Sequence, residues 1–131
     1  MTAVLLAAIL QTVVPTRSLD KGPTSQIDGA RQAVARSEVE WTAMWNEHAG
    51  NRVRPPVDFS KEMVVAVFLG TRPTAGFSVE IVGAREEGTA LVVSYRETRP
   101  QPGNVTAQIL TSPYHIVAVS KHGDVRWERV N

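Results

Sequence analysis

The sequence MVVAVFL at residues 63–69 is an uninterrupted apolar run that ends at Gly70. An apolar run of this length without alternation is typical of a central strand that is covered on both faces. The run therefore predicts a sheet with other parts of the chain packed against each of its sides.

A helix is predicted upstream of this strand. Residues 37–40 (SEVE) form a capping box, in which the Ser37 hydroxyl accepts a hydrogen bond from the amide three residues later. Apolar and aromatic residues then recur every three to four positions, at Trp41, Met44, Trp45 and His48. Gly50 is typical of a helix C-terminus, and residues 29–35 before the helix are expected to form a short strand.

Downstream of residue 69 the pattern changes to alternation and turns. A hairpin turn is expected at residues 86–88. Strands are expected on either side of it and further along, at residues 77–82, 91–96, 108–111, 114–120 and 125–129. One N-terminal helix packed on a mainly antiparallel β-sheet of about six strands is an α+β fold, which we expect to be a sandwich or a partial barrel.

Composition limits the function classes. The chain has 131 residues, which suits one domain, and its 14 Lys plus Arg against 13 Asp plus Glu argue against nucleic-acid binding. The absence of Cys excludes disulfides, thiolate zinc sites and a cysteine nucleophile. No cofactor is expected.

The N-terminal segment has its own pattern. Residues 3–10 are apolar, too few to span a membrane but enough for the core of a secretory signal. We therefore expect a signal peptide at residues 1–15, a polar linker at 16–26 and the folded domain at 27–131, in an extracytoplasmic (periplasmic or secreted) bacterial protein. The alternative is that the apolar stretch is a buried first strand or helix.

Catalytic and metal-binding patterns are weak. Ser112, His115 and either Asp124 or Asp58 supply the residue types of a hydrolase triad, but Ser112 precedes a proline and lacks the glycine-flanked nucleophile turn. The three histidines are too scattered for a convincing metal site. We expect no catalytic residues, no metal and no enzyme activity.

The most unusual segment is GTRPTAG at residues 70–76. It is either a hairpin loop with conformationally demanding glycines or an interaction edge, at which Arg72 and Thr74 are polar anchors beside Phe77. The tryptophans also allow two interpretations. They form a core shared by the helix and the last strand, or Trp45 and Trp127 line a ligand pocket between helix and sheet.

Three segments, at residues 57–70 (VDFSKEMVVAVFLG), 74–81 (TAGFSVEI) and 111–117 (TSPYHIV), resemble in order the motifs of the PrcB-like (PrcB C-terminal) domain family, named after a subunit of a bacterial protease complex. The similarity covers roughly residues 27–130. Ala75 stands where the family has glycine, and Phe77 stands where it has tyrosine.

The resemblance implies a non-catalytic, exported protein–protein interaction module, an accessory or stabilising subunit of a protease complex. No nucleic acid and no membrane span are expected. The contact residues that we expect are Arg72, Thr74, Gly76, Phe77, Pro113, Tyr114 and His115. A small-molecule or peptide binding protein with a pocket between helix and sheet is the alternative.

Overall fold

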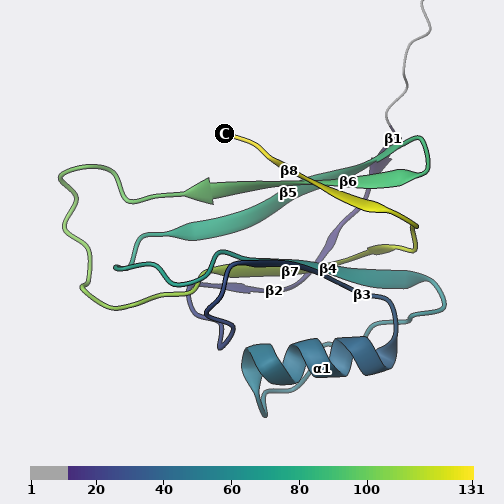
Figure 1. The fold of residues 1–131 in the computed structure, drawn as a ribbon, viewed down its shortest axis with the longest axis horizontal. Coiled ribbons are helices and arrows are strands. Elements are labelled where there is room, and N and C mark those ends of the chain that lie inside the picture. Colours follow the sequence, from purple (N-terminus) through teal and green to yellow (C-terminus); the bar gives the residue numbers. More distant parts are fainter. Residues whose placement is uncertain (1–11) are drawn as a thin grey trace, which may run out of the picture.

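Two four-stranded sheets and one helix form three layers in the computed structural model, which describes residues 12–131 (Figure 1). Sheet A has the strand order β1-β5-β6-β8 and sheet B the order β2-β7-β4-β3, while α1 covers the outer face of sheet B. The elements are β1 (Thr12–Val14), β2 (Arg17–Gly22), β3 (Arg31–Ala35), α1 (Glu38–Ala49), β4 (Glu62–Phe68), β5 (Ser78–Glu87), β6 (Ala90–Thr98), β7 (Tyr114–Ser120) and β8 (Val125–Arg129).

Strand β4 lies in the middle layer and confirms the predicted central strand. It pairs antiparallel with β3 on one side and β7 on the other. Val65 and Val67 face the core between the two sheets, whereas Val64 and Phe68 face the core under the helix. Both faces are buried, which is why the sequence shows no alternation of apolar and polar residues.

Helix α1 begins and ends where the sequence predicts. The Ser37 hydroxyl accepts from the Glu40 amide (3.2 Å), the Glu40 carboxylate accepts from the Arg36 amide (2.8 Å), and Gly50 caps the other end with φ 58°. Trp41 and Trp45 are buried against sheet B. The helix is thus fixed to the sheet by its aromatic face.

The structure corrects the strand count and its layout. There are eight described strands in two sheets, and β8 runs parallel to β6. No strand forms at residues 108–111, where Thr111 makes only an isolated bridge to Arg72. The hairpin is confirmed, but its turn lies at residues 88–89 and not at 86–88, because Glu86 and Glu87 still pair with Leu91 and Ala90.

Part of the segment that was expected to be a linker is a strand. Residues 17–22 form β2, which pairs with β7 and has a bulge between Ser18 and Asp20. Residues 12–14 form β1, which pairs with β5, and Val14 is buried in the core. The fold therefore includes residues before Ile27, while residues 3–10 lie outside the part that the structure describes.

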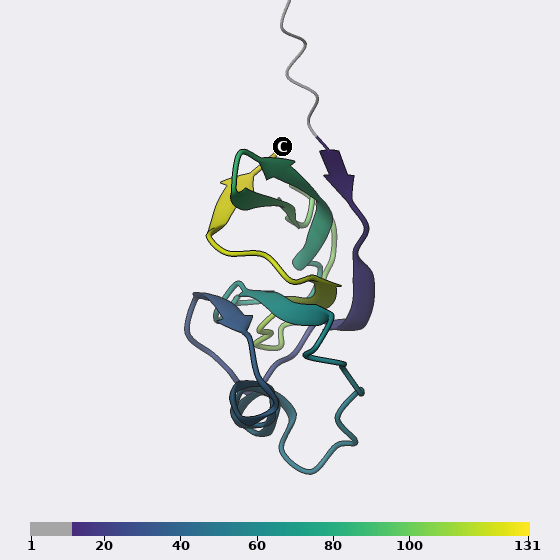
Figure 2. The same ribbon diagram turned by 90° about the vertical axis from the view of Figure 1, so that its right-hand side faces the viewer.

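The two long sides of the sandwich differ. On one side the chain passes directly from β1 in sheet A to β2 in sheet B (Figure 2). On the opposite side, β3 and β8 are the edge strands of the two sheets. Within residues 12–131, no helix is long and apolar enough to cross a membrane.

Candidate functional site

Two loop segments meet at one end of the sandwich, and we call residues 70–77 and 99–113 together the loop end. The Arg72 amide donates to the Thr111 carbonyl (2.7 Å), and the Thr111 amide donates back to Arg72 (3.0 Å). The Ala75 amide donates to the Ala107 carbonyl (3.0 Å), and the Thr111 hydroxyl donates to the Thr74 carbonyl (3.0 Å). The structure thus brings together two loop segments that are far apart in sequence.

Gly76 is needed for the close approach of these segments. Its φ is 95°, and a Cβ at this position would lie 2.9 Å from Cγ of Pro100. A side chain here would be strained by its backbone and would also push the two segments apart.

Arg72 anchors the loop end to sheet A. Its Nε donates to the Glu97 carboxylate (2.9 Å), its Nη1 donates to the Leu69 carbonyl (3.1 Å), and its guanidinium carbon lies 5.9 Å from the centre of the Phe77 ring. Most of the hydrogen-bonding capacity of Arg72 is therefore used within the chain. Arg72 thus stabilises the fold of the loop, whereas its predicted role as an anchor for a partner stays a prediction.

Glu97 on β6 is a carboxylate surrounded by arginines, which sequence reasoning missed. Its side chain is 0% exposed, and its oxygens lie 2.8 Å from Arg72, 2.7 Å from Arg129 and 3.6 Å from Arg99. Burial tends to raise the pKa of Glu97, but the hydrogen bond and charge of Arg72, with the charges of Arg99 and Arg129, outweigh it and lower the pKa. Three guanidinium groups around one carboxylate leave an excess of two positive charges.

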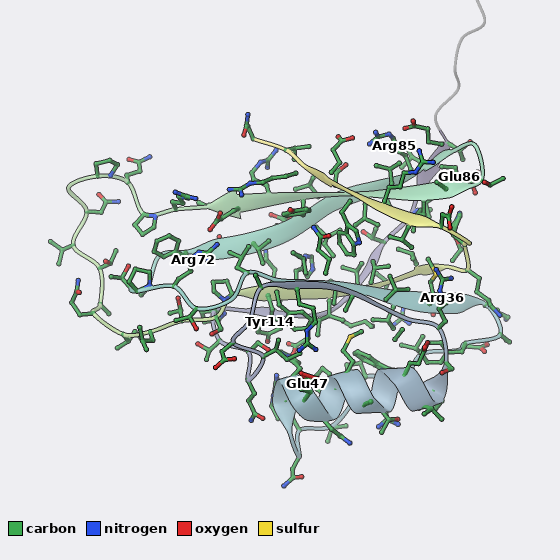
Figure 3. The ribbon with its side chains drawn as sticks, viewed as in Figure 1. Arg36, Glu47, Arg72, Arg85, Glu86 and Tyr114 are labelled. Carbon is green, nitrogen blue, oxygen red and sulfur yellow. The ribbon has the colours of Figure 1, made fainter. Side chains whose placement is uncertain are left out.

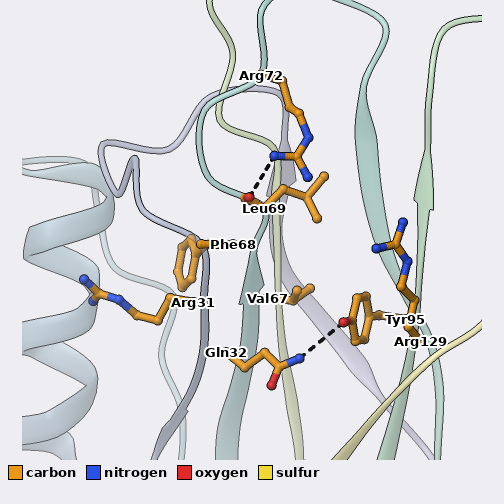
Figure 4. A pocket seen from close by; sticks show the side chains of 9 residues that line it. Arg31, Gln32, Val67, Phe68, Leu69, Arg72, Tyr95 and Arg129 are labelled. Carbon is orange, nitrogen blue, oxygen red and sulfur yellow. Dashed lines mark hydrogen bonds between the residues drawn. The ribbon is translucent and has the colours of Figure 1, made fainter.

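A cleft of about 340 Å³ opens beside this cluster, between the edge of β3 and sheet A (Figure 4). Its lining residues are Ala30, Arg31, Gln32, Val67, Phe68, Leu69, Arg72, Tyr95 and Arg129. The Gln32 amide donates to the Tyr95 hydroxyl across the cleft (3.3 Å), and the Arg31 side chain turns toward the helix, where it pairs with Glu47 (2.7 Å). The cleft thus combines an apolar floor with a cationic end.

The expected contact residues of the third motif are buried, which corrects their role. Pro113 is buried, and its carbonyl accepts from the Leu69 amide (2.9 Å). Tyr114 lies between sheet B and the helix, with its ring centre 4.2 Å from that of His48 (Figure 3). Because β7 is covered on both faces, these side chains stabilise the core and are not presented to a partner.

His115 links the two sheets from the inside. Its Nδ1 accepts from the Ile81 amide of β5 (2.8 Å), so the neutral ring carries its proton on Nε2, which donates to the Ser18 hydroxyl (2.9 Å). Burial, with the nearby charge of Lys21, lowers the pKa of His115 to about 4. His115 therefore bonds Ser18 and Ile81, and both of its ring nitrogens are taken by groups other than Ser112, Asp124 and Asp58.

A different Ser-His-Asp group does form beside the helix. Nε2 of His48 donates to the Asp20 carboxylate (2.9 Å), Nδ1 accepts from the Ser25 hydroxyl (2.7 Å), and that hydroxyl accepts from the Ile27 amide (2.9 Å). Burial lowers the pKa of His48 although the Asp20 carboxylate acts in the opposite direction. The His48 side chain is 0% exposed and Ser25 is buried, so the group connects β2, the segment after it and α1.

Neither a metal site nor the tryptophan pocket is found in the described structure. Within residues 12–131, no group of three His, Cys, Asp or Glu side chains could hold a metal ion. Trp45 packs between α1 and sheet B, whereas Trp127 packs against the core between the sheets, 6.2 Å from Tyr95. Because sheet B separates the two tryptophans, the interpretation of a shared core or shared pocket is wrong.

Exposed apolar side chains gather on the longer segment of the loop end. Ile109 and Leu110 are 59% and 72% exposed, and Val105 is fully exposed. Sequence reasoning missed Ile109 and Leu110 because residues 108–111 are predicted to form a strand, and no pattern pointed to Val105. The loop end therefore presents apolar groups to solvent on a backbone that the Arg72 and Ala75 hydrogen bonds hold in place.

Comparison with known proteins finds a match to a protein family. Residues 63–120 match the family described as PrcB C-terminal, and no curated protein or solved structure is significantly similar to the chain. The matched segment runs from β4 to β7 and includes both parts of the loop end. The helix with Trp41 and Trp45 lies outside it. Residues 63–120 of this chain are therefore similar to the PrcB C-terminal family, and they make up 58 of its 131 residues.

Proposed function

We propose that this protein is a non-catalytic, exported interaction module, an accessory or stabilising subunit of a protease complex, and that it contacts its partner through the loop end. The observation that carries the proposal is the exposure of Val105, Ile109 and Leu110 within the PrcB-like segment. Large apolar side chains that gather on a soluble surface mark sites of protein–protein contact.

The contacts that hold the loop end in a fixed conformation support this role. Loops that a rigid scaffold holds in place are common binding surfaces. Here Arg72 fastens one segment to Glu97, and Gly76 allows it to pack against Pro100. A surface that is already ordered loses less conformational entropy on binding than a mobile one.

The non-catalytic part of the proposal is supported by the histidines. His48 and His115 each have both ring nitrogens engaged by neighbouring groups of the fold. Both rings are buried, so neither acts as a general base toward a bound substrate in this conformation.

The partner is tested by capture from the host's envelope and culture fluid with the tagged protein, followed by quantitative mass spectrometry. We expect one protease in near-equal amount. The double variant Ile109→Ser and Leu110→Ser is expected to lose it. The matched control is Val39→Ser with Val53→Ser, which removes two exposed valines (80% and 92%) outside the loop end and is expected to retain the protease.

Two results would contradict this proposal. Equal recovery with the loop-end variant would remove the loop end as the contact surface. The absence of a protease from every capture would remove the accessory role.

Export is tested separately because it depends on residues 3–10, whose apolar pattern suits a secretory signal. A C-terminally tagged chain expressed in a bacterial host is expected in the periplasm or the culture fluid. The same chain without residues 1–11 is expected in the cytoplasm. Recovery of both forms from the cytoplasm would contradict export.

A further inference from the structure

On the side of the sandwich opposite β1 and β2, sheet B ends in a strand edge that has no partner strand within residues 12–131. Strand β3 (Arg31–Ala35) forms this edge and pairs with β4 in a regular register. Sheet B's opposite edge is different, because β2 carries a bulge between Ser18 and Asp20. Regular edges without bulges or prolines are the ones to which an extended peptide can add as a further strand.

Two arginines that contact Glu97 have unused donors: Arg129, which lines the cleft beside β3, and Arg99, which does not line it but lies on the same carboxylate. Arg129 donates one Nη2 hydrogen bond to Glu97 (2.7 Å), and its remaining N–H groups have no hydrogen-bond partner in the described part of the chain. Arg99 lies 3.6 Å from Glu97 and makes no side-chain hydrogen bond within residues 12–131. The two side chains are 52% and 67% exposed, so they can approach an incoming anion.

The apolar part of the cleft suits a side chain next to that anion. Val67, Leu69 and Tyr95 line it, and its volume of about 340 Å³ is at the lower end of the range for ligand sites. The Gln32–Tyr95 hydrogen bond across it is long (3.3 Å) and easily exchanged for a bond to a ligand.

We propose that this cleft binds a carboxylate of an extended peptide that adds to the edge of β3. The carboxylate is held by Arg129 and Arg99, an apolar side chain on the same face of the peptide occupies the apolar floor, and the peptide backbone pairs with residues 31–35. Charge complementarity selects this occupant, because the cluster around Glu97 has two positive charges in excess. The inference goes beyond the proposed function, since it concerns a different surface and a ligand that is tested without any captured partner.

The test uses three labelled hexapeptides of alternating valine and threonine. One has a free C-terminal carboxylate, one is amidated, and one is amidated with a single glutamate in place of a valine. We expect binding by a carboxylate-bearing peptide and not by the neutral one, with weaker binding at high salt. Whether the free C-terminus or the glutamate supports binding identifies the source of the carboxylate.

Spectra of the ¹⁵N-labelled protein locate the peptide. The amide signals of residues 31–35 are expected to shift, whereas those of β1 and β2 are not. Equal binding of the neutral peptide, the absence of binding by all three peptides, or shifts confined to other strands would each overturn the proposal. A dimer formed through β3 that excludes the peptide, detected by sedimentation, would also overturn it.

Protein variants complete the test. Arg129→Gln and Arg99→Gln are each expected to weaken binding about tenfold, which is the effect of losing a charge-assisted hydrogen bond. Arg126→Gln is the matched control, because Arg126 is exposed on β8, does not line the cleft and makes no ion pair with Glu97. Arg99 makes no hydrogen bond to the described fold, so Arg99→Gln remains informative if Arg129→Gln is unstable. Unchanged affinity in Arg99→Gln together with a folded, unchanged Arg129→Gln would refute the assigned donors.

Discussion

The side chain of His115 on β7 accepts a hydrogen bond from the backbone amide of Ile81 on β5, over 2.8 Å, and so joins sheet B to sheet A through the core. The bond requires an unprotonated Nδ1. It also satisfies an amide next to the irregular register between Ile81 and Gly83, where β5 departs from regular pairing with β6.

The pKa of His115 makes stability depend on pH. In the folded chain this pKa is about 4, below the ordinary value of 6.5, so the unfolded chain takes up the proton first as pH falls. The contribution of His115 to the free energy of unfolding is complete above about pH 6.5 and is lost by about pH 4. Its size is on the order of 3 kcal/mol. Urea unfolding followed by tryptophan fluorescence at both ends of this window measures it. Between these two pH values, the His115→Gln variant is expected to lose clearly less stability than the parent. An equal loss in both proteins would show that protonation of His115 is not the cause.

Replacement of the buried carboxylate of Glu97 is expected to destabilise the fold. Glu97→Ala leaves Arg72 without its ion-pair partner, and we expect a loss of about 2–3 kcal/mol, below the usual range for a buried pair because the arginines still reach water. Glu38→Ala is the matched control, since its pair with Arg54 is exposed and contributes at most about 1 kcal/mol. Chemical denaturation of both variants compares them, and equal losses would show that the Glu97 cluster has no special role.

Gly70, which ends the apolar run of β4, is expected to tolerate no side chain. Its φ is 81°, and a Cβ would lie 2.8 Å from the backbone nitrogen of Ala30. Gly70→Ala should cost about 2 kcal/mol or more, because backbone strain and a clash with main-chain atoms act together. Gly83→Ala is the control with open space and an ordinary φ, and its melting temperature should stay near that of the parent. Similar melting temperatures for the two variants would contradict this account.

Ser25 is expected to act in stability rather than in catalysis. Ser25→Ala removes the acceptor for the buried Ile27 amide and the donor to His48, which should cost about 1–3 kcal/mol. Ser60→Ala, at an exposed serine bonded to Asp58, should cost less than about 0.5 kcal/mol. Ester hydrolysis by the parent that disappears in Ser25→Ala would contradict the non-catalytic proposal.

The helix and the central strand could be predicted because their signals are local. The cap at Ser37 and the spacing of Trp41 and Trp45 lie within one helix, and residues 63–69 are apolar because both faces of β4 are covered. Strand β2 could not be predicted, because its side chains are mostly exposed and its partner β7 lies near the other end of the chain. Residues 108–111 resemble a strand in composition but have no strand beside them.

The candidate site was predictable only in part, for a related reason. The unusual composition of residues 70–76 pointed to Arg72, yet no pattern near Glu97 identifies it as the partner of three arginines. His115 was expected on the surface because the continuous apolar segment around it does not show which side chains face a second sheet. Contacts between layers depend on topology, which a single sequence does not contain.

The position of β7 between β2 and β4 has a consequence for synthesis. Three strands of sheet B (β2, β3 and β4) precede β5 in the sequence, whereas β7 follows β6. A nascent chain that has emerged only as far as β6 therefore lacks the strand that joins β2 to β4. Until residues 114–120 leave the ribosome, the apolar side chains of β4 have no neighbour on that edge. Sheet B is therefore completed late in synthesis. Until then the unfinished chain exposes unpaired apolar strands, to which chaperones and other factors that act on unfolded polypeptides can bind.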